Sequence, residues 1–370
     1  MTEEAYLAGA KKVNLNWISD TQNRLHFTYA DEETLAATLP WEKEKLRQMT
    51  EDLPVRIFIE SEDPDALAGL DPEKLSHVMQ SRAAVAKPFR DAIDGIHQWC
   101  IAALPSPKWA KKCFPDLSEE DAVEQLFAAV LKTVRIADGN DAIADWKAHT
   151  DRITAKSDWL NAQHFRQLKY TSSNGTDFTV GLIPEASWEG AGAINKKNDA
   201  FYIPNMPTEE IFTSPLAGCC EGTLVAVKPL CWNGQLIENF SITFEDGRAV
   251  SCSAEKGQAL LEKMLHMDEG ASKLGEVALV PKESPVNACG FLFYSTLFDE
   301  NACCHFAVGQ GFKEILPGGE QLSTEEAAAA GINDSIIHVD FMVGAEDLSI
   351  TGIREDGSCV PVFVNGTWAE

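Results

Sequence analysis

The chain has 370 residues, of which 31 are Lys or Arg and 57 are Asp or Glu, giving a formal net charge of −26. This acidity argues against nucleic acid and anionic membrane as partners, and we interpret it mainly as a means of solubility. The length suits two domains, and a hydrophobic content of 45% can fill their cores. No segment approaches the roughly 18 uninterrupted apolar residues of a membrane span, and no signal-peptide pattern opens the chain. We therefore expect a cytoplasmic protein.

The ten cysteines do not have the spacing of a disulfide framework or a zinc ribbon. They include the adjacent pairs Cys219-Cys220 and Cys303-Cys304, and the sequence has no Cys-x-x-Cys. Others, such as Cys100, lie within apolar runs, as buried free thiols do. We expect every thiol to be free.

Residues 1–168 predict an N-terminal α/β domain. An Ala-rich helix over residues 1–12 leads into a first strand, Val13–Ile18, and Val55–Glu60 and Trp99–Pro105 provide two more strands. Strands that alternate with helices indicate a parallel sheet. Two long helices close this region. The first has an apolar stripe of 3.6-residue period from Ala122 to Val134, and the second carries Trp146, His149 and Ile153 on its apolar side, where His149 is expected to pack.

From residue 169 the pattern changes to an α+β domain that is largely antiparallel and extends to residue 370. Asn-Gly or Asp-Gly dipeptides at 174–175, 233–234, 246–247, 356–357 and 365–366 each lie near β-type residues and predict tight hairpins. The segment 242–251 is the clearest of them. Helices are expected only at 258–267 and 324–330.

The stretch Leu292–Gly309 is the most informative part of this second domain. An apolar run passes into Asp299, Glu300 and Asn301, then reaches His305 and returns to apolar residues. Carboxylates and an imidazole between hydrophobic runs are expected to be partly buried, and buried charge must be paired or bound to metal.

Three further stretches have a similar character. Glu276 lies at the head of a strand-like run, and His338 and Asp340 are two residues apart in another, so in a strand both point to one side. Glu209 and Glu210 follow a proline in a predicted loop. Together these residues form a mixed nitrogen and oxygen set that suits two divalent ions such as Zn, Co or Mn. Taken singly, each residue is weak evidence for a metal site. A lone histidine on a strand is more often a packed core residue, and a pair such as Glu209-Glu210 is more often a solvated turn.

Other chemistries are not supported. The sequence has no His-Glu-x-x-His, Gly-x-Ser-x-Gly or P-loop, and Gly309-x-Gly311 lacks the rest of a dinucleotide fingerprint. Cys304 beside His305 is a poor thiol nucleophile, because a nucleophile needs spatial rather than sequential pairing with its base.

These stretches resemble the signature segments of the aminopeptidase T / aminopeptidase S family of metal-dependent aminopeptidases. The matching segments are Asn205–Thr213, Gly275–Val280, Thr296–His305 and His338–Gly344, in the family's order and spacing. The resemblance covers nearly the whole chain. It implies two divalent metal ions per chain, with Zn, Co, Mn and Mg all open as their identity.

The resemblance also implies roles for individual residues. The family's metal ligands match Glu210, Glu276, His305, His338 and Asp340. Glu300 matches a further acidic position, as a ligand or as the catalytic carboxylate that handles the proton of the attacking water. Two features depart from the family. The chain begins partway through the first αβ unit, so the parallel sheet is expected to lack its first strand, and Phe312 stands where well-known members have a Tyr. Tyr294 is considered as a substitute for that hydroxyl.

The function implied is hydrolysis of the N-terminal residue from short peptides with a free amino group, by a homodimer that encloses its active sites. Two alternatives stay open. One is a different metallohydrolase acting on a small amide or ester at the same site, and the other is a binding protein with a vestigial site.

Overall fold

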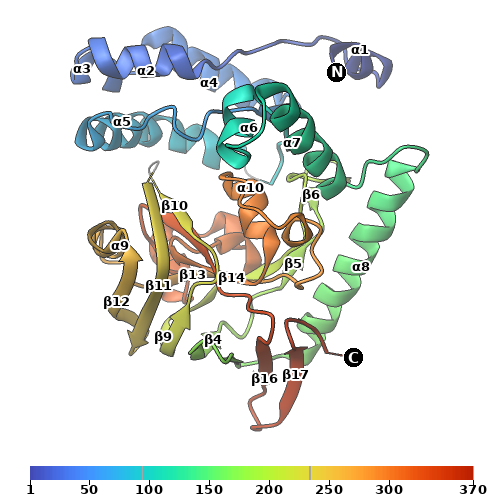
Figure 1. The fold of residues 1–370 in the computed structure, drawn as a ribbon, viewed down its shortest axis with the longest axis vertical. Helices are drawn as coiled ribbons and strands as arrows, with labels where there is room; N and C mark the ends of the chain where they lie inside the picture. Colours follow the sequence, from blue (N-terminus) through green and yellow to red (C-terminus); the bar gives the residue numbers. More distant parts are fainter. Residues whose placement is uncertain (94, 233–234, 370) are drawn as a thin grey trace.

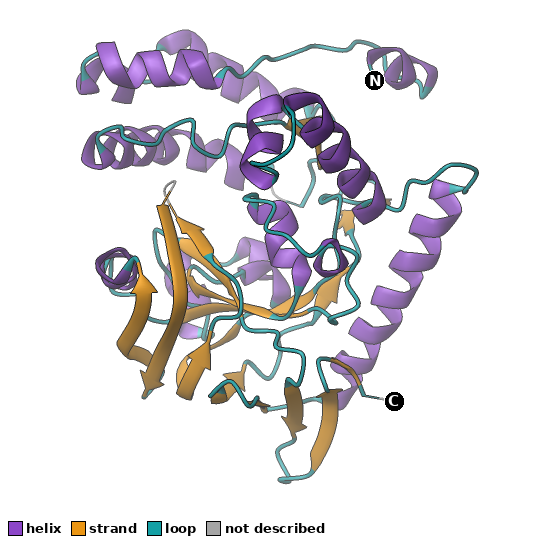
Figure 2. Ribbon diagram, in the orientation of Figure 1, coloured by secondary structure: helices purple, strands orange, loops and turns teal. Residues whose placement is uncertain are grey.

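The computed structural model describes residues 1–93, 95–232 and 235–369. Helices dominate the first part of the chain and strands the second, and Figure 2 shows most helices at the top and along one side, with a few helices among the strands. The prediction of an α/β part followed by an α+β part, largely antiparallel, agrees with this arrangement. None of the helices in the described residues is long and apolar enough to cross a membrane.

The described residues of the first part form eight helices and one small sheet. Its elements are α1 (Thr2–Leu7), α2 (Asp20–Tyr29), α3 (Glu32–Ala36), α4 (Pro40–Asp52), β1 (Arg56–Glu60), α5 (Pro72–Asp91), β2 (Trp99–Ala103), α6 (Pro107–Cys113), α7 (Glu119–Thr133) and α8 (Ala142–Gln163). Strands β1 and β2 pair in parallel, in register from Arg56↔Trp99 to Glu60↔Ala103. The second and third predicted strands and their parallel pairing are therefore confirmed.

The prediction of a strand over Val13–Ile18 is wrong. The segment runs as irregular chain between α1 and α2, and β1 pairs only with β2 among the described residues. Its apolar–polar alternation is that of a strand, but a strand exists only where a neighbour accepts its backbone hydrogen bonds. Trp17 is instead 90% exposed. Within the described ranges, the parallel sheet therefore consists of β1 and β2.

Helices α7 and α8 form as their patterns predict. Ser118 caps α7 by accepting a hydrogen bond from the Asp121 amide, and Asp141 caps α8 through the Ala144 amide. The α7 stripe of Ala122, Leu126 and Val130 is buried, in a hydrophobic cluster that also holds Phe298 from the second part of the chain. Helix α8 runs along one side of the molecule, as Figure 1 shows, and contacts β5 and β8.

The second part contains two larger sheets. Their strands are β3 (Gln167–Thr171), β4 (Asp177–Leu182), β5 (Glu189–Gly190), β8 (Ile211–Thr213), β9 (Pro215–Val225), β10 (Leu230–Trp232), β11 (Gln235–Glu245), β12 (Arg248–Lys256), β13 (Leu274–Leu279), β14 (His305–Gly309), β15 (His338–Met342), β16 (Ser349–Ile353), β17 (Cys359–Val364) and β18 (Thr367–Trp368). A 9-stranded sheet has the order β10-β11-β9-β4-β3-β16-β17-β18, with β12 on β11, and a 5-stranded sheet has the order β15-β14-β13-β8-β5. Strands β6 (Ala193–Asn195) and β7 (Ala200–Tyr202) form a separate hairpin.

The shorter elements of this part are helical. They are α9 (Gln258–Leu265), α10 (Thr296–Asp299), α11 (Thr324–Ala329) and the 3-10 turns η1 (Asn287–Cys289), η2 (Glu300–Ala302), η3 (Lys313–Ile315) and η4 (Gly319–Gln321). Helices α9 and α11 confirm the two predicted helices. The short α10 within the Leu292–Gly309 stretch was not predicted.

Most of the predicted hairpins form. Positions 174–175, 246–247, 356–357 and 365–366 each lie between consecutive antiparallel strands. The hairpin predicted at Asn233-Gly234 falls outside the described residues. All ten cysteines lie in the described part, and none of them forms a disulfide there, as predicted.

The main core lies between the two larger sheets. Phe306 of the smaller sheet packs against Tyr170 and Phe178 of the larger one, with ring centroids 5.0 and 5.4 Å apart. Its neighbours across the smaller sheet, Val277 and Phe341, are buried in the same cluster. Because side chains alternate along a strand, the intervening residues point to the opposite side of this sheet. The predicted division into domains between residues 168 and 169 stays a prediction; it falls within β3, just after the short link that follows α8.

Truncating a core side chain should lower the free energy of unfolding far more than truncating a surface side chain. Phe178 is fully buried and contacts Phe244 and Phe306, whereas Phe201 is 54% exposed. We expect Phe178→Ala to lower the free energy of unfolding by about 3–5 kcal/mol, and Phe201→Ala by less than about 1 kcal/mol, in urea titrations. Equal losses in the two variants would contradict this packing.

The buried His149 joins α8 to the loop before β8. Its Nε2–H donates to the Thr208 carbonyl oxygen at 2.7 Å, and its ring stands edge-on to Trp146. Burial, reinforced by the charge of Arg135, lowers the pKa of His149 to about 4. In the unfolded chain His149 therefore binds a proton near pH 6.5, whereas in the native protein it stays neutral until about pH 4. The free energy of unfolding falls as the pH falls from 6.5 towards 4.

Replacing His149 should weaken this pH dependence. Between pH 7 and pH 5 we expect wild type to lose about 2 kcal/mol more unfolding free energy than His149→Gln does. Urea titrations of both proteins at the two pH values measure this difference. An equal loss in wild type and variant would show that His149 takes up its proton alike in both states.

Candidate metal centre

The side of the smaller sheet that faces away from the core carries four of the predicted ligands. Glu276 lies on β13, His305 begins β14, and His338 and Asp340 lie on β15. The register places Glu276 opposite Ala307 and Ala307 opposite Asp340, so one line of neighbours crosses three strands. His305 and His338 are each two residues from this line on their own strand, and therefore share its side of the sheet. Ala307, fully buried between the two carboxylates, leaves room above the sheet.

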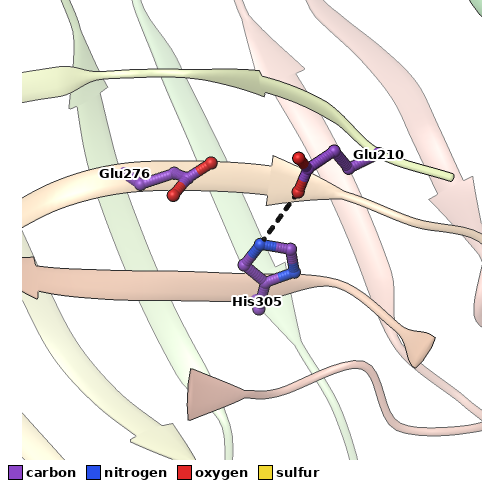
Figure 3. Close-up of side chains that lie close together, drawn as sticks. All are labelled: Glu210, Glu276 and His305. Carbon is purple, nitrogen blue, oxygen red and sulfur yellow. Dashed lines mark ion pairs between the residues drawn. The ribbon is translucent and has the colours of Figure 1, made fainter. Parts of the chain in front are cut away.

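The fifth predicted ligand arrives from a loop. Glu210 immediately precedes β8, which pairs with β13, so its side chain reaches the same side of the sheet. Figure 3 shows Glu210 and His305 pointing toward one another, with Glu276 beside them on the central strand. The Glu210 side chain is only 13% exposed, so the predicted carboxylate pair is not a solvated turn.

The five side chains form two groups that share one member. Glu210, Glu276 and His305 place ligand atoms within 4.8 Å of one another, and so do Glu276, His338 and Asp340. The His305 Nε2 atom lies 3.2 Å from a Glu210 oxygen, and the His338 Nε2 atom lies 3.0 Å from Glu276 and 3.3 Å from Asp340. Ligand atoms about 2.0–2.2 Å from a common ion lie at most about 4.4 Å apart, so both groups are near the required spacing.

Both imidazoles are oriented as in metal sites. The His305 Nδ1 atom lies 3.2 Å from the Cys303 carbonyl oxygen, and the His338 Nδ1 atom lies 2.7 Å from that of Gln310. Donation from Nδ1 to a carbonyl fixes the ring and leaves Nε2 directed at the carboxylates, an arrangement that metal-binding histidines generally have. The sequence did not predict these two carbonyl partners, because any residue supplies a carbonyl.

The pKa values of Glu276, His305 and His338 are raised, which favours protonation of the site and shows that its carboxylates favour positive charge nearby. Burial raises the pKa of Glu276 to about 7, with a further contribution from the charge of Asp340. Burial alone would lower the pKa of both imidazoles, but neighbouring carboxylates raise it to about 9 for His305 and about 11 for His338. Without another cation, protons would have to neutralise these carboxylates.

These observations fit divalent metal ions. The buried Asp340 Oδ1 atom accepts no hydrogen bond in the described part of the chain, and its contact with the His338 Nε2 atom at 3.3 Å is an ion pair. Buried carboxylate and imidazole atoms at this spacing are a suitable donor set for Zn, Co or Mn. The donor set therefore supports a site for divalent metal ions.

Glu300 and Asn301 lie in η2, the turn after α10, and Glu300 is close enough to the ligand carboxylates to interact with them electrostatically. Burial, together with the charges of Glu210 and Asp340, raises the pKa of Glu300 well above its ordinary value. Glu300 belongs to neither of the two ligand groups found in the described residues. The fully buried Asn301 accepts a hydrogen bond from the Glu209 amide at 2.6 Å and donates to the Leu297 carbonyl, so it ties the Glu210 loop to α10.

Asp299 and Glu209, which adjoin predicted site residues, have structural partners instead. Asp299 accepts hydrogen bonds from the amides of Phe293 and Ser295 and so closes the loop before α10. Glu209 forms an ion pair with Arg135 at 2.6 Å. Sequence reasoning named Asn301 without assigning it a role and did not identify Arg135, because both act on Glu209, which lies far away along the chain.

Phe312 lines the site. Its ring centroid lies 5.0 Å from that of His338 and 5.3 Å from that of Phe212. Tyr294, considered as a substitute donor, has the Lys112 amino group of α6 over its ring at 5.2 Å. Its contacts therefore give no support to that substitution.

Comparison with known proteins agrees with the donor set. Residues 1–368 match the family model described as thermophilic metalloprotease (M29). The chain is 40% identical over 370 residues to aminopeptidase PepS of Streptococcus thermophilus and 38% identical over 369 residues to aminopeptidase T of Thermus aquaticus, in each case spanning 100% of this chain and 89% of the relative.

A solved structure agrees with these sequence comparisons. Wild-type AmpT from Thermus thermophilus superposes with a TM-score of 0.91 at 37% sequence identity, covering 100% of this chain and 89% of that one. The resemblance read from the sequence segments is thus confirmed, as is the expectation of an enzyme. The chain belongs to the M29 family of thermophilic metalloproteases and is a metal-dependent peptide hydrolase.

Proposed function

We propose that this enzyme is an aminopeptidase that releases the N-terminal residue from short peptides with the help of two divalent ions. The observation that carries the proposal is the pair of ligand groups that share Glu276, because a shared carboxylate is what holds two ions side by side. The relatives are named aminopeptidases, which favours this activity over other peptide hydrolysis.

In this proposal the five predicted ligands divide between two ions. Glu210 and His305 would hold one ion, His338 and Asp340 the other, and Glu276 would contact both. Bound there, the ions would lower the pKa of a water molecule towards about 7 and polarise the scissile carbonyl. The choice among Zn, Co, Mn and Mg is open.

Glu300 is our candidate for proton transfer. Glu300 interacts electrostatically with the ligand carboxylates but belongs to neither ligand group. Its carboxylate would therefore be available to accept the proton of the attacking water. The same carboxyl group would then give that proton to the departing amine, as a general acid. Its raised pKa favours this return step, because a carboxyl group in an acidic, buried setting holds a proton readily.

The acidic surroundings also suggest how cleavage is confined to the N-terminal residue. A free α-amino group is a cation near neutral pH, and carboxylates of the site attract it, whereas an acetylated terminus has no such charge. Short peptides, a homodimer and a cytoplasmic location remain part of the proposal.

The first prediction from this proposal concerns metal content. Wild type should retain about two ions per chain after dialysis. Glu276→Gln and His338→Ala should retain fewer, since the first removes the shared ligand and the second an imidazole. Elemental analysis measures this, with Glu238→Gln and His266→Ala as controls, because Glu238 pairs with Lys256 and His266 is exposed. Unchanged metal content in both site variants would remove the site as proposed.

The second prediction concerns the substrate. With Co, Zn or Mn present, the enzyme should release the N-terminal residue of a short unblocked peptide and leave its N-acetylated form intact. Chromatography of the products of both peptides measures this. Equal cleavage of the two would instead indicate a general amide hydrolase, and no cleavage with any metal would favour a vestigial site.

The third prediction concerns Glu300 and Phe312. Glu300→Gln should lower kcat by roughly 10²–10⁴-fold, the usual contribution of a general base or acid. Phe312→Tyr should leave kcat unchanged or raise it, because a hydroxyl there would lie near His338 and the reacting carbonyl. Tyr294→Phe is the matched control and should keep kcat within about twofold. Full activity in Glu300→Gln would exclude it from proton transfer.

A further inference from the structure

A second feature of the structure lies between α7 and α8, outside both ligand groups. A cavity of about 410 Å³ opens there between the end of α7, the connecting loop and the first half of α8. Figure 1 shows the two helices and the loop that joins them. The charged side chains that line it are Lys132, Arg135, Asp145 and Arg152, and apolar atoms come from Ala128 and Ile136 among others.

The cations of this cavity are largely uncompensated. Arg135 is paired with Glu209, but Lys132 and Arg152 form no hydrogen bond or ion pair through their side chains with any described residue. Lys132, Arg135 and Arg152 therefore outnumber Asp145 and Glu209 around one hollow. Such a local excess of positive charge is unusual in a chain whose net charge is −26, because acidic residues are abundant and yet do not neutralise it.

The cavity is also preorganised. Arg152 and Asp145 are seven residues apart on α8 and so share one side of that helix. Arg135 is held by Glu209 on one side and lies with its guanidinium 5.5 Å from the Trp146 ring centroid. A guanidinium fixed in this way loses little conformational entropy when it binds an anion.

We propose that this cavity binds a small molecule through an oxyanion group, either a carboxylate or a phosphate. Guanidinium and ammonium groups donate strong, charge-assisted hydrogen bonds to both anions. The apolar atoms of Ala128 and Ile136 would contact the remainder of such a molecule. The volume is large enough for a ligand well beyond a single ion. This site is separate from the proposed peptidase chemistry, and its test uses neither metal nor peptide cleavage.

The test is isothermal titration calorimetry of chelator-treated protein with sodium phosphate and, separately, sodium acetate. Removal of metal prevents either anion from binding at the metal centre, and sodium chloride at equal ionic strength serves as the blank. We expect saturable binding of one anion per chain for at least one of the two probes. Binding of phosphate alone or of acetate alone would identify which oxyanion the cavity takes.

Variants then locate the binding. Arg152→Gln and Lys132→Gln should each weaken binding by roughly tenfold, the effect of losing one charge-assisted hydrogen bond. Lys147→Gln is the matched control, because Lys147 lies on α8 but pairs with Asp151, and it should leave the affinity unchanged. Both site residues are exposed, and an unchanged Tm would confirm that the variants fold. Binding of neither probe, or equal binding in the Arg152→Gln/Lys132→Gln double variant, would overturn the proposal.

Discussion

The concentration of buried carboxylates on one side of the smaller sheet is the constraint on which the rest of the structure depends. Glu210, Glu276 and Asp340 converge there and interact electrostatically with Glu300, and like charges at such distances cannot all ionise without cations nearby. The imidazoles of His305 and His338 respond with strongly raised pKa values. Metal ions bound there would supply the missing charge, so metal binding and catalysis would depend on the same residues.

The antiparallel register converts a sequence pattern into a site. Pairing of Glu276 with Ala307, and of Ala307 with Asp340, sets two carboxylates on either side of the smallest side chain in the line. The alternate residues of the same strands, such as Phe306, pack against the larger sheet. A one-residue slip of any of these strands would exchange the two sides, so the core packing also fixes the ligands.

Much of this could be predicted from the sequence, and the failures have physical causes. The ligand candidates were recognisable because carboxylates and imidazoles interrupt apolar runs, and the spacing of His338 and Asp340 is that of one strand side. The segment Val13–Ile18 alternates like a strand but pairs with no other strand among the described residues, which no local pattern reveals. The roles of Asn301 and Arg135 were equally hidden, because each depends on the loop that holds Glu209, far away in sequence.

The central claim is that two cation sites share Glu276, and anomalous diffraction tests it most directly. Crystals grown with excess Zn or Mn, measured at the absorption edge of that metal, should show two peaks roughly 3.5–4 Å apart, with Glu276 in contact with both. One peak should adjoin Glu210 and His305, and the other should adjoin His338 and Asp340. A single peak, or peaks away from Glu276, would contradict the account.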